Sequence, residues 1–136
     1  MTQIQRGTDQ TEGYLLSLLD AYQAEHFAMD SVSQTYTLEI FVEGKRAGGI
    51  LWQRLDQVGH VKYLAVEPDF RRLGLGAQLM QAVEAEAREL NLRILSVNTQ
   101  DYQGLNFYPA LGYEVVGQIE DYPLVGTTKY FLKKEL

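Results

Sequence analysis

Apolar residues recur along this chain in separate stretches, and the spacing within each stretch predicts a secondary-structure element. Between residues 11 and 28 they return every three or four positions, which predicts helix with Thr11 as its N-cap. Residues 36–43 alternate with period two, and two further strand segments, 46–55 and 60–66, follow after short turns. Together they predict three neighbouring strands in an antiparallel meander.

The strongest helical pattern runs from residue 74 to residue 90, with one apolar stripe and with Glu84 among the residues expected to face elsewhere. A short, apolar strand is predicted next, at 94–97. Strand, helix and strand in succession predict a crossover that joins two parallel strands. The last predicted elements are a short helix and two strands, at 103–111, 113–119 and 129–133.

This order of elements predicts an α/β (α+β) fold with a mixed central sheet, an antiparallel meander and flanking helices. The length of 136 residues fits one domain, residues 1–136. The net charge of −6 disfavours nucleic acid as a partner and is compatible with attracting a cationic substrate.

The composition also excludes several kinds of site. There is no cysteine, so disulfides, thiolate metal sites and a cysteine nucleophile are excluded, and the two histidines lie far apart in the sequence, so no metal site is predicted. No stretch approaches the roughly 18 apolar residues of a membrane span, and the N-terminus lacks the apolar core of a signal peptide. We therefore expect a cytoplasmic protein with no membrane partner.

The turn between the third strand and the long helix carries the clearest chemical signal. It contains Arg71, Arg72, Gly74 and Gly76 at the entry to a helix. A helix N-terminus presents unpaired backbone N–H groups and favours anions, glycine lets a ligand approach the backbone, and arginine adds positive charge. The turn therefore predicts a phosphate or pyrophosphate site.

Two common nucleotide motifs do not fit this turn. A P-loop requires Lys-Ser or Lys-Thr after its last glycine, and neither pair occurs here. A dinucleotide fingerprint requires a third glycine where Leu79 stands. The pattern that remains is Arg-x-x-Gly-x-Gly, made by Arg71, Gly74 and Gly76.

This pattern resembles the acyl-coenzyme A site of the GNAT superfamily of N-acetyltransferases. Upstream, the strand ending Leu64-Ala65-Val66 followed by Pro68 and Phe70 is similar to the strand that precedes the site in that family. Downstream, the run Asn-Phe-Tyr-Pro-Ala-Leu-Gly-Tyr at 106–113 resembles the family's second signature. The resemblance covers residues 38–136 and implies the GNAT fold, in which the parallel strand pair is splayed.

The resemblance implies where acetyl-CoA binds. Its pyrophosphate would bind, with help from Arg71 or Arg72, to backbone N–H groups of Leu73, Gly74, Leu75, Gly76 and Ala77. Its pantetheine arm would lie between the splayed ends of the strands at 64–66 and 94–97, bound like an added strand by Leu64, Ala65 and Val66. A backbone N–H near Val66 would stabilise the oxyanion. Asp101 stands where many members carry an asparagine, so Asn98 is expected to take that role instead.

The resemblance also makes Tyr108 the candidate general acid, because the family signature places a tyrosine hydroxyl near the sulfur. A tyrosine with a pKa of about 10 can protonate a departing thiolate whose thiol has a pKa of about 8.5. The candidate general base is His60, whose ordinary pKa suits neutral pH. Glu67, Asp101 and Tyr63 are open alternatives for the base.

We therefore expect an acetyl-CoA-dependent N-acetyltransferase that moves an acetyl group to a primary amine by direct transfer in a ternary complex. The alternative is a non-catalytic coenzyme A-binding sensor or partner module. The acceptor is expected to be a small-molecule or peptide amine, whose identity the sequence does not encode. The resemblance also allows a homodimer paired through the last strands.

Overall fold

The computed structural model describes residues 1–27 and 32–136. The chain divides into two units, Met1–Ser31 and Val32–Leu136, and each is described by itself. The single domain expected from the sequence stays a prediction. None of the helices in the described ranges combines the length and apolar character needed to cross a bilayer.

The first unit contains one helix, α1 (Thr11–Ala24). Its N-cap is Gln10 rather than Thr11, and no side chain caps the helix. Thr11 lies inside the first turn, where its Oγ1 accepts a hydrogen bond of 2.9 Å from the N–H of Thr8. Residue 28, the predicted end of this helix, lies outside the described residues.

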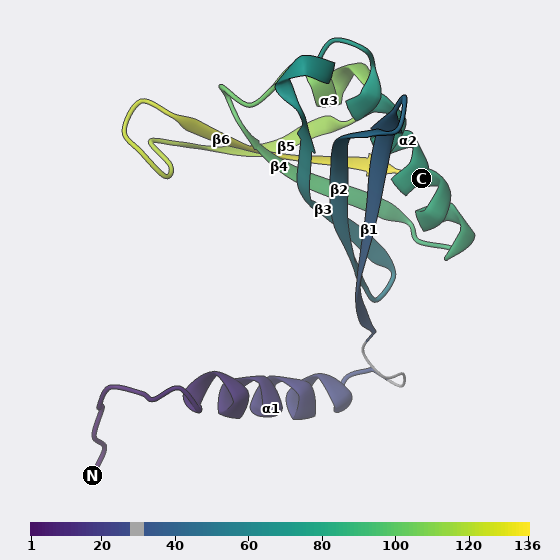
Figure 1. The fold of residues 1–136 in the computed structure, drawn as a ribbon. Coiled ribbons are helices and arrows are strands. Elements are labelled where there is room, and N and C mark those ends of the chain that lie inside the picture. The colour runs from purple at the N-terminus through teal and green to yellow at the C-terminus, as the bar shows by residue number, and fades with distance from the viewer. Residues whose placement is uncertain (28–31) are drawn as a thin grey trace. The chain divides into compact units, whose positions relative to one another are not determined.

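The second unit is built on one six-stranded sheet with the order β1-β2-β3-β4-β6-β5 (Figure 1). The first three strands form the predicted antiparallel meander, β3 and β4 are parallel, and β5 and β6 form an antiparallel pair. The mixed sheet and flanking helices confirm the predicted fold class. The strands are β1 (Ser33–Val42), β2 (Lys45–Leu55), β3 (Val58–Val66), β4 (Ile94–Gln100), β5 (Glu114–Glu120) and β6 (Thr128–Glu135).

The parallel pair is splayed, and the opening lies further along β4 than expected. Only Val58–Val61 of β3 pairs with β4, opposite Ile94–Val97. Residues 94–97 of β4, which were predicted to border the opening, are therefore paired with β3. The opening lies beyond Val97. Beyond that point β4 continues its antiparallel pairing with β6 as far as Gln100.

A bulge in β3 gives a physical reason for the splay. Opposite β2, Tyr63 pairs with Leu51 and Val61 pairs with Trp52, so Lys62 is an extra residue in β3. A bulge bends its strand and increases the local twist. Because the β3–β4 ladder ends at this bulge, the remainder of β3 diverges from β4.

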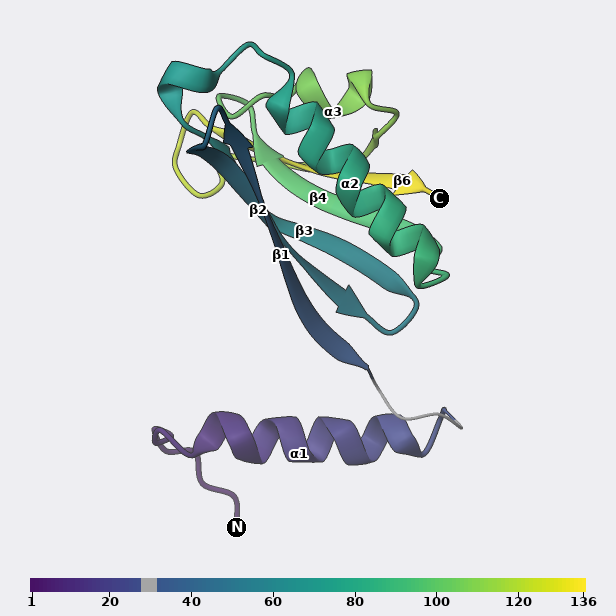
Figure 2. The same ribbon diagram turned by 45° about the vertical axis from the view of Figure 1, so that its right-hand side comes forward.

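Helix α2 (Leu75–Glu89) lies across one face of the sheet (Figure 2). Its apolar stripe meets a core centred on Trp52, Leu95 and Leu132, all at most 1% exposed. Glu84 does not face solvent as predicted, since only 3% of it is exposed. The sequence pattern within the helix misplaced this residue because its ionic partner, Lys134, lies in β6.

The predicted helix at 103–111 is much shorter in the structure. Helix α3 (Phe107–Ala110) is preceded by turns, and Gly104 has a φ of +108°, which a right-handed helix cannot contain. A short 3-10 helix, η1 (Pro68–Phe70), follows β3 and leads into the glycine turn. These two short segments both contribute to the candidate active site.

Candidate active site

The glycine turn ends in a helix N-terminus that no side chain caps. Arg72 and Gly74 both have positive φ values, 65° and 76°, and Gly74 is the N-cap of α2. The first turn of α2 contains no acidic residue. Backbone N–H groups at Leu75, Gly76 and Ala77 are thus presented at the positive end of the helix dipole.

Helix α3 packs directly against this turn. A Cβ atom added to Gly76 would lie 3.2 Å from Cζ of Phe107, closer than an ordinary van der Waals contact. The absence of a side chain at Gly76 therefore lets the Phe107 ring approach α2. This contact places the residue after Phe107, Tyr108, beside the glycine turn.

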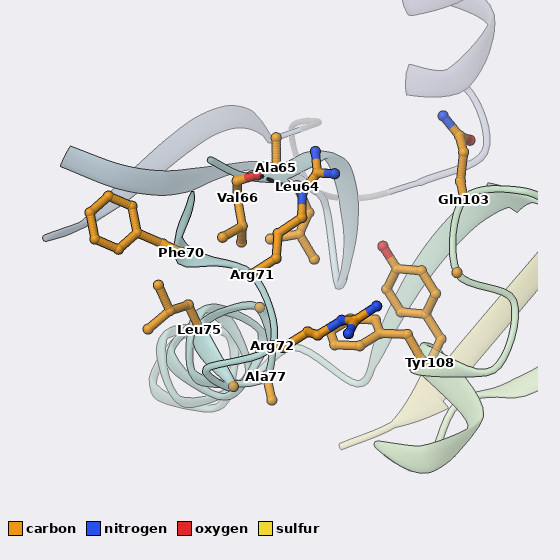
Figure 3. Close-up of a pocket in the computed structure, with 14 residues that line it drawn as sticks. Leu64, Ala65, Val66, Phe70, Arg71, Arg72, Leu75, Ala77, Gln103 and Tyr108 are labelled. Carbon is orange, nitrogen blue, oxygen red and sulfur yellow. Dashed lines mark hydrogen bonds between the residues drawn. The ribbon is translucent and has the colours of Figure 1, made fainter. Parts of the chain in front are cut away.

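A cavity of about 600 Å³ lies between the turn, the end of β3 and α3 (Figure 3). It brings together most of the predicted acetyl-CoA residues, but not Leu73, which is exposed, nor Asn98. The hydroxyl of Tyr108 points into it, as Figure 3 shows. The lining residues are Leu64, Ala65, Val66, Phe70, Arg71, Arg72, Gly74, Leu75, Gly76, Ala77, Gln103, Gly104, Phe107 and Tyr108.

A second cavity, of about 270 Å³, occupies the opening between the splayed strands. Asn98 lines this one, together with the segment of β3 from Val61 to Ala65. The two cavities share Leu64, Ala65, Gln103 and Tyr108. The two cavities are therefore adjacent around these residues, and together they are named the channel.

The end of β3 turns backbone groups toward this channel. The N–H of Glu67 donates to the carbonyl of Ala47 in a 2.7 Å hydrogen bond. Because bonding direction alternates along an antiparallel ladder, the N–H and C=O of Val66 point away from β2. The carbonyl of Val66 accepts a 3.3 Å hydrogen bond from Nε of Arg71 (Figure 3). The same alternation turns the backbone groups of Leu64 toward the opening.

Tyr108 is held firmly between aromatic and backbone neighbours. Only 7% of it is exposed, and this burial raises the pKa of its hydroxyl above 10. The ring meets those of Phe107 and Tyr113 edge to face. A buried phenol with a raised pKa stays protonated throughout the neutral range and can donate a proton.

His60 lies on β3 but outside the lining of both cavities. Its Nδ1 is 2.8 Å from the hydroxyl oxygen of Ser96, and that hydroxyl donates to the carbonyl of Gly59 at 3.5 Å. Nδ1 donates to this hydroxyl in one tautomer of the ring and accepts from it in the other. Burial, Lys129 and Lys62 lower the pKa of His60, so the ring is neutral at pH 7.

Sequence reasoning missed several residues of the channel. Phe70 and Phe107 belong to the two quoted motifs and could have been named from them, whereas Gln103 and Thr99 carry no signal in the sequence. Lys62 reaches the second cavity at the bulge, which the alternating pattern of β3 does not reveal.

Comparison with known proteins agrees with this geometry. The chain shares its fold with an acetyltransferase from Bacillus cereus, at a TM-score of 0.91 and 26% identity over 99% of this chain and 98% of that one. A protein described as a streptothricin acetyltransferase from Bacillus anthracis, solved with acetyl coenzyme A, has a TM-score of 0.69 at 15% identity, over 83% of this chain and 67% of that one. The fold is thus that of an acetyltransferase.

The sequence comparisons define the family. Residues 5–113 match the model of the acetyltransferase (GNAT) family. The chain is 42% identical to a blasticidin-S acetyltransferase from Streptomyces morookaense over 98 residues, 68% of either chain. The chain therefore belongs to the GNAT acetyltransferase family. It is an N-acetyltransferase, and its acyl donor is acetyl-CoA. The predicted activity, acetyl transfer to an amine, is thereby confirmed.

Proposed function

We propose that this enzyme transfers the acetyl group directly, in a ternary complex, with Tyr108 as general acid. The observation that carries the proposal is the Tyr108 hydroxyl in the channel shared by both cavities. The pyrophosphate of acetyl-CoA binds the N–H groups from Leu73 to Ala77, assisted by Arg71 or Arg72. The pantetheine arm follows Leu64, Ala65 and Val66, opposite Asn98.

The reaction then needs three groups around the thioester. The amine nitrogen attacks the thioester carbon, and the N–H of Val66 stabilises the oxyanion that forms. The C–S bond breaks as the intermediate collapses, and the thiolate takes the proton of the Tyr108 hydroxyl. The nitrogen loses its extra proton to the base, and the Tyr108 phenolate regains a proton through water.

Replacing Tyr108 with Phe tests the general acid. We expect kcat to fall about 100-fold, the range of a general acid, while KM for acetyl-CoA changes less than about threefold. Tyr36→Phe is the matched control, because the Tyr36 hydroxyl bonds Gln34 outside the channel. Thiol release from acetyl-CoA measures turnover, and a Tyr108→Phe variant within twofold of wild type would exclude this role.

We propose His60 as the base, acting through water. The support is its lowered pKa, which favours the neutral ring, and water is required because His60 lies outside the lining of both cavities. His60→Gln should lower kcat and remove a protonation step below pH 6.5 from its pH profile, with acetyl-CoA affinity unchanged. A profile identical to that of wild type would transfer the role to Glu67, Asp101 or Tyr63.

We further propose a cationic small-molecule amine as acceptor, with blasticidin S the first compound to test. The support is the 42% identical relative and the net charge of −6. A panel of blasticidin S, spermidine and a peptide with a free N-terminus should release thiol fastest with blasticidin S. Equal or faster release with the peptide would refute this choice.

We also propose that the protein is located in the cytoplasm.

A homodimer through the last strands is likewise a proposal. It is supported by the position of β5 at the edge of the sheet, with every residue exposed. Exposed edge strands pair readily with a second chain. Sedimentation should give a dimer that Val116→Lys, on β5, converts to monomer, whereas a wild-type monomer at all concentrations would end the proposal.

A further inference from the structure

A partly buried ion pair joins α2 to β6 beside the end of α3. The Nζ atom of Lys134 lies 2.6 Å from Oε1 of Glu84, whose side chain is only 4% exposed. The same Nζ donates to the carbonyl of Leu111, the C-cap of α3, at 2.8 Å. Lys134 therefore contacts two elements that its own strand does not pair with.

The other oxygen of Glu84 is also engaged. The Tyr113 hydroxyl donates to Oε2 of Glu84 at 3.2 Å. Burial and this carboxylate raise the pKa of Tyr113, so its hydroxyl remains a donor. Arg88 is a more distant partner, 3.7 Å from Oε1 and half-exposed. The carboxylate is thus held from three sides, by Lys134 of β6, by Tyr113 beyond the C-cap of α3 and by Arg88 of its own helix.

Glycine at position 112 leaves room for the approach of Lys134 to α3. Gly112 has a φ of +95°, and a Cβ atom there would lie 3.3 Å from Cε of Lys134. Buried ion pairs add little net stability compared with apolar side chains of similar size. We therefore expect the Glu84–Lys134 pair to contribute to the position of neighbouring residues rather than to stability.

The residues that the Glu84–Lys134 pair binds contact Tyr108 through the backbone and through an aromatic ring. The carbonyl of Tyr108 accepts hydrogen bonds from the N–H groups of Leu111, at 2.9 Å, and Tyr113, at 3.1 Å. The Tyr113 ring lies edge to face with the Tyr108 ring, 6.0 Å between centroids. Leu111 is held by Lys134 and Tyr113 by Glu84. Both residues that fix Tyr108 are therefore fixed by the ion pair.

We propose that Glu84 and Lys134 are positioning residues that hold the Tyr108 hydroxyl in the channel by securing the end of α3 to α2 and β6. Phe107, packed on Gly76, secures the other end of the same helix. The inference rests on the proposed role of Tyr108 only where turnover is concerned. The position of Tyr108 is a separate, measurable property.

The first experiment measures that position without any acceptor. 3-Fluorotyrosine is incorporated at position 108, and its ¹⁹F signal is followed through a pH titration. The test protein is Glu84→Gln/Lys134→Met, because Lys134→Met alone would leave a buried carboxylate without its nearest cation and destabilise the fold. Thermal unfolding confirms that the double variant is folded.

In the double variant we expect a broader ¹⁹F signal and a fluorophenol pKa lowered toward that of exposed fluorotyrosine, because Tyr108 loses burial. Arg88→Met is the matched control, since it removes the exposed partner of the same carboxylate, and it should leave the spectrum unchanged. An unchanged spectrum in a folded double variant would overturn the proposal.

The second experiment measures turnover with blasticidin S as acceptor. The double variant should lower kcat about tenfold with KM for acetyl-CoA unchanged, and it should lower kcat no further in a Tyr108→Phe background. An equal loss in both backgrounds would mean that the pair acts on something other than Tyr108. Full turnover by Tyr108→Phe would instead refute the general acid, and the ¹⁹F spectrum would still decide the positioning role.

Discussion

Gly48 offers a sharp test of the idea that the end of β3 binds acetyl-CoA through its backbone. A Cβ atom added to Gly48 would lie 2.5 Å from the carbonyl oxygen of Ala65 and 3.0 Å from Cα of Val66. Both are backbone atoms, so no side chain can move aside. A Cβ atom essentially never lies within 3.0 Å of such an atom, so the peptide between Ala65 and Val66 must move by about 0.5 Å.

The moved peptide group contains the N–H of Val66. In Gly48→Ala we therefore expect loss of the hydrogen bonds that we propose between Leu64 and Val66 and the pantetheine arm. Two bonds of about 0.5–1.5 kcal/mol each weaken acetyl-CoA binding by roughly 1–3 kcal/mol, about 5- to 150-fold. The strain itself should lower the free energy of unfolding by about 1–3 kcal/mol.

Calorimetric titration with acetyl-CoA measures the affinity, and urea unfolding measures the stability. Gly117→Ala is the matched control, because Gly117 is also in a strand and a Cβ atom there meets nothing within 4 Å. The control should bind acetyl-CoA as wild type does. If a folded Gly48→Ala variant also binds within twofold of wild type, the end of β3 does not bind the donor.

Two further predictions concern the glycine turn and His60. In Gly74→Ala the new methyl group meets no atom, but the φ of +76° is strained for alanine. The free energy of unfolding should therefore fall by about 1–2 kcal/mol, and acetyl-CoA should bind more weakly. Unchanged stability in urea unfolding would contradict this. Because the folded-state pKa of His60 lies below its ordinary value of 6.5, the folded protein binds fewer protons than the unfolded chain between those two values. Stability is therefore full above pH 6.5 and falls as the pH drops through this window. His60→Gln should show a smaller fall in melting temperature between pH 7 and pH 5, and an equal fall would count against the lowered pKa.

Much of the fold could be predicted because the apolar periodicity of each element is local. The meander, the crossover helix and the parallel strand pair all follow from spacing within about ten residues. The burial of Glu84 could not be predicted this way, since its carboxylate is compensated by Lys134, fifty residues away in β6. A helical pattern with one charged residue on its core side looks the same whether or not a partner exists elsewhere.

The candidate site also contains residues that could be predicted from the sequence and residues that could not. Arg71, Gly74 and Tyr108 could be named because each belongs to a short motif with fixed spacing. The point where β3 leaves β4 could not, because it depends on a bulge at Lys62 that appears only when β3 is paired with β2. Gln103 reaches the channel through turns whose conformation no periodic pattern describes.

The early end of the β3–β4 ladder has a consequence for how the sequence of such a site diverges between relatives. Beyond Val61 and Val97 the strand backbones present N–H and C=O groups that the partner strand does not use, and we propose that the donor binds to them. Backbone contacts of this kind depend little on which side chains the strands carry. An acetyltransferase that is only 26% identical shares this fold along nearly its whole length.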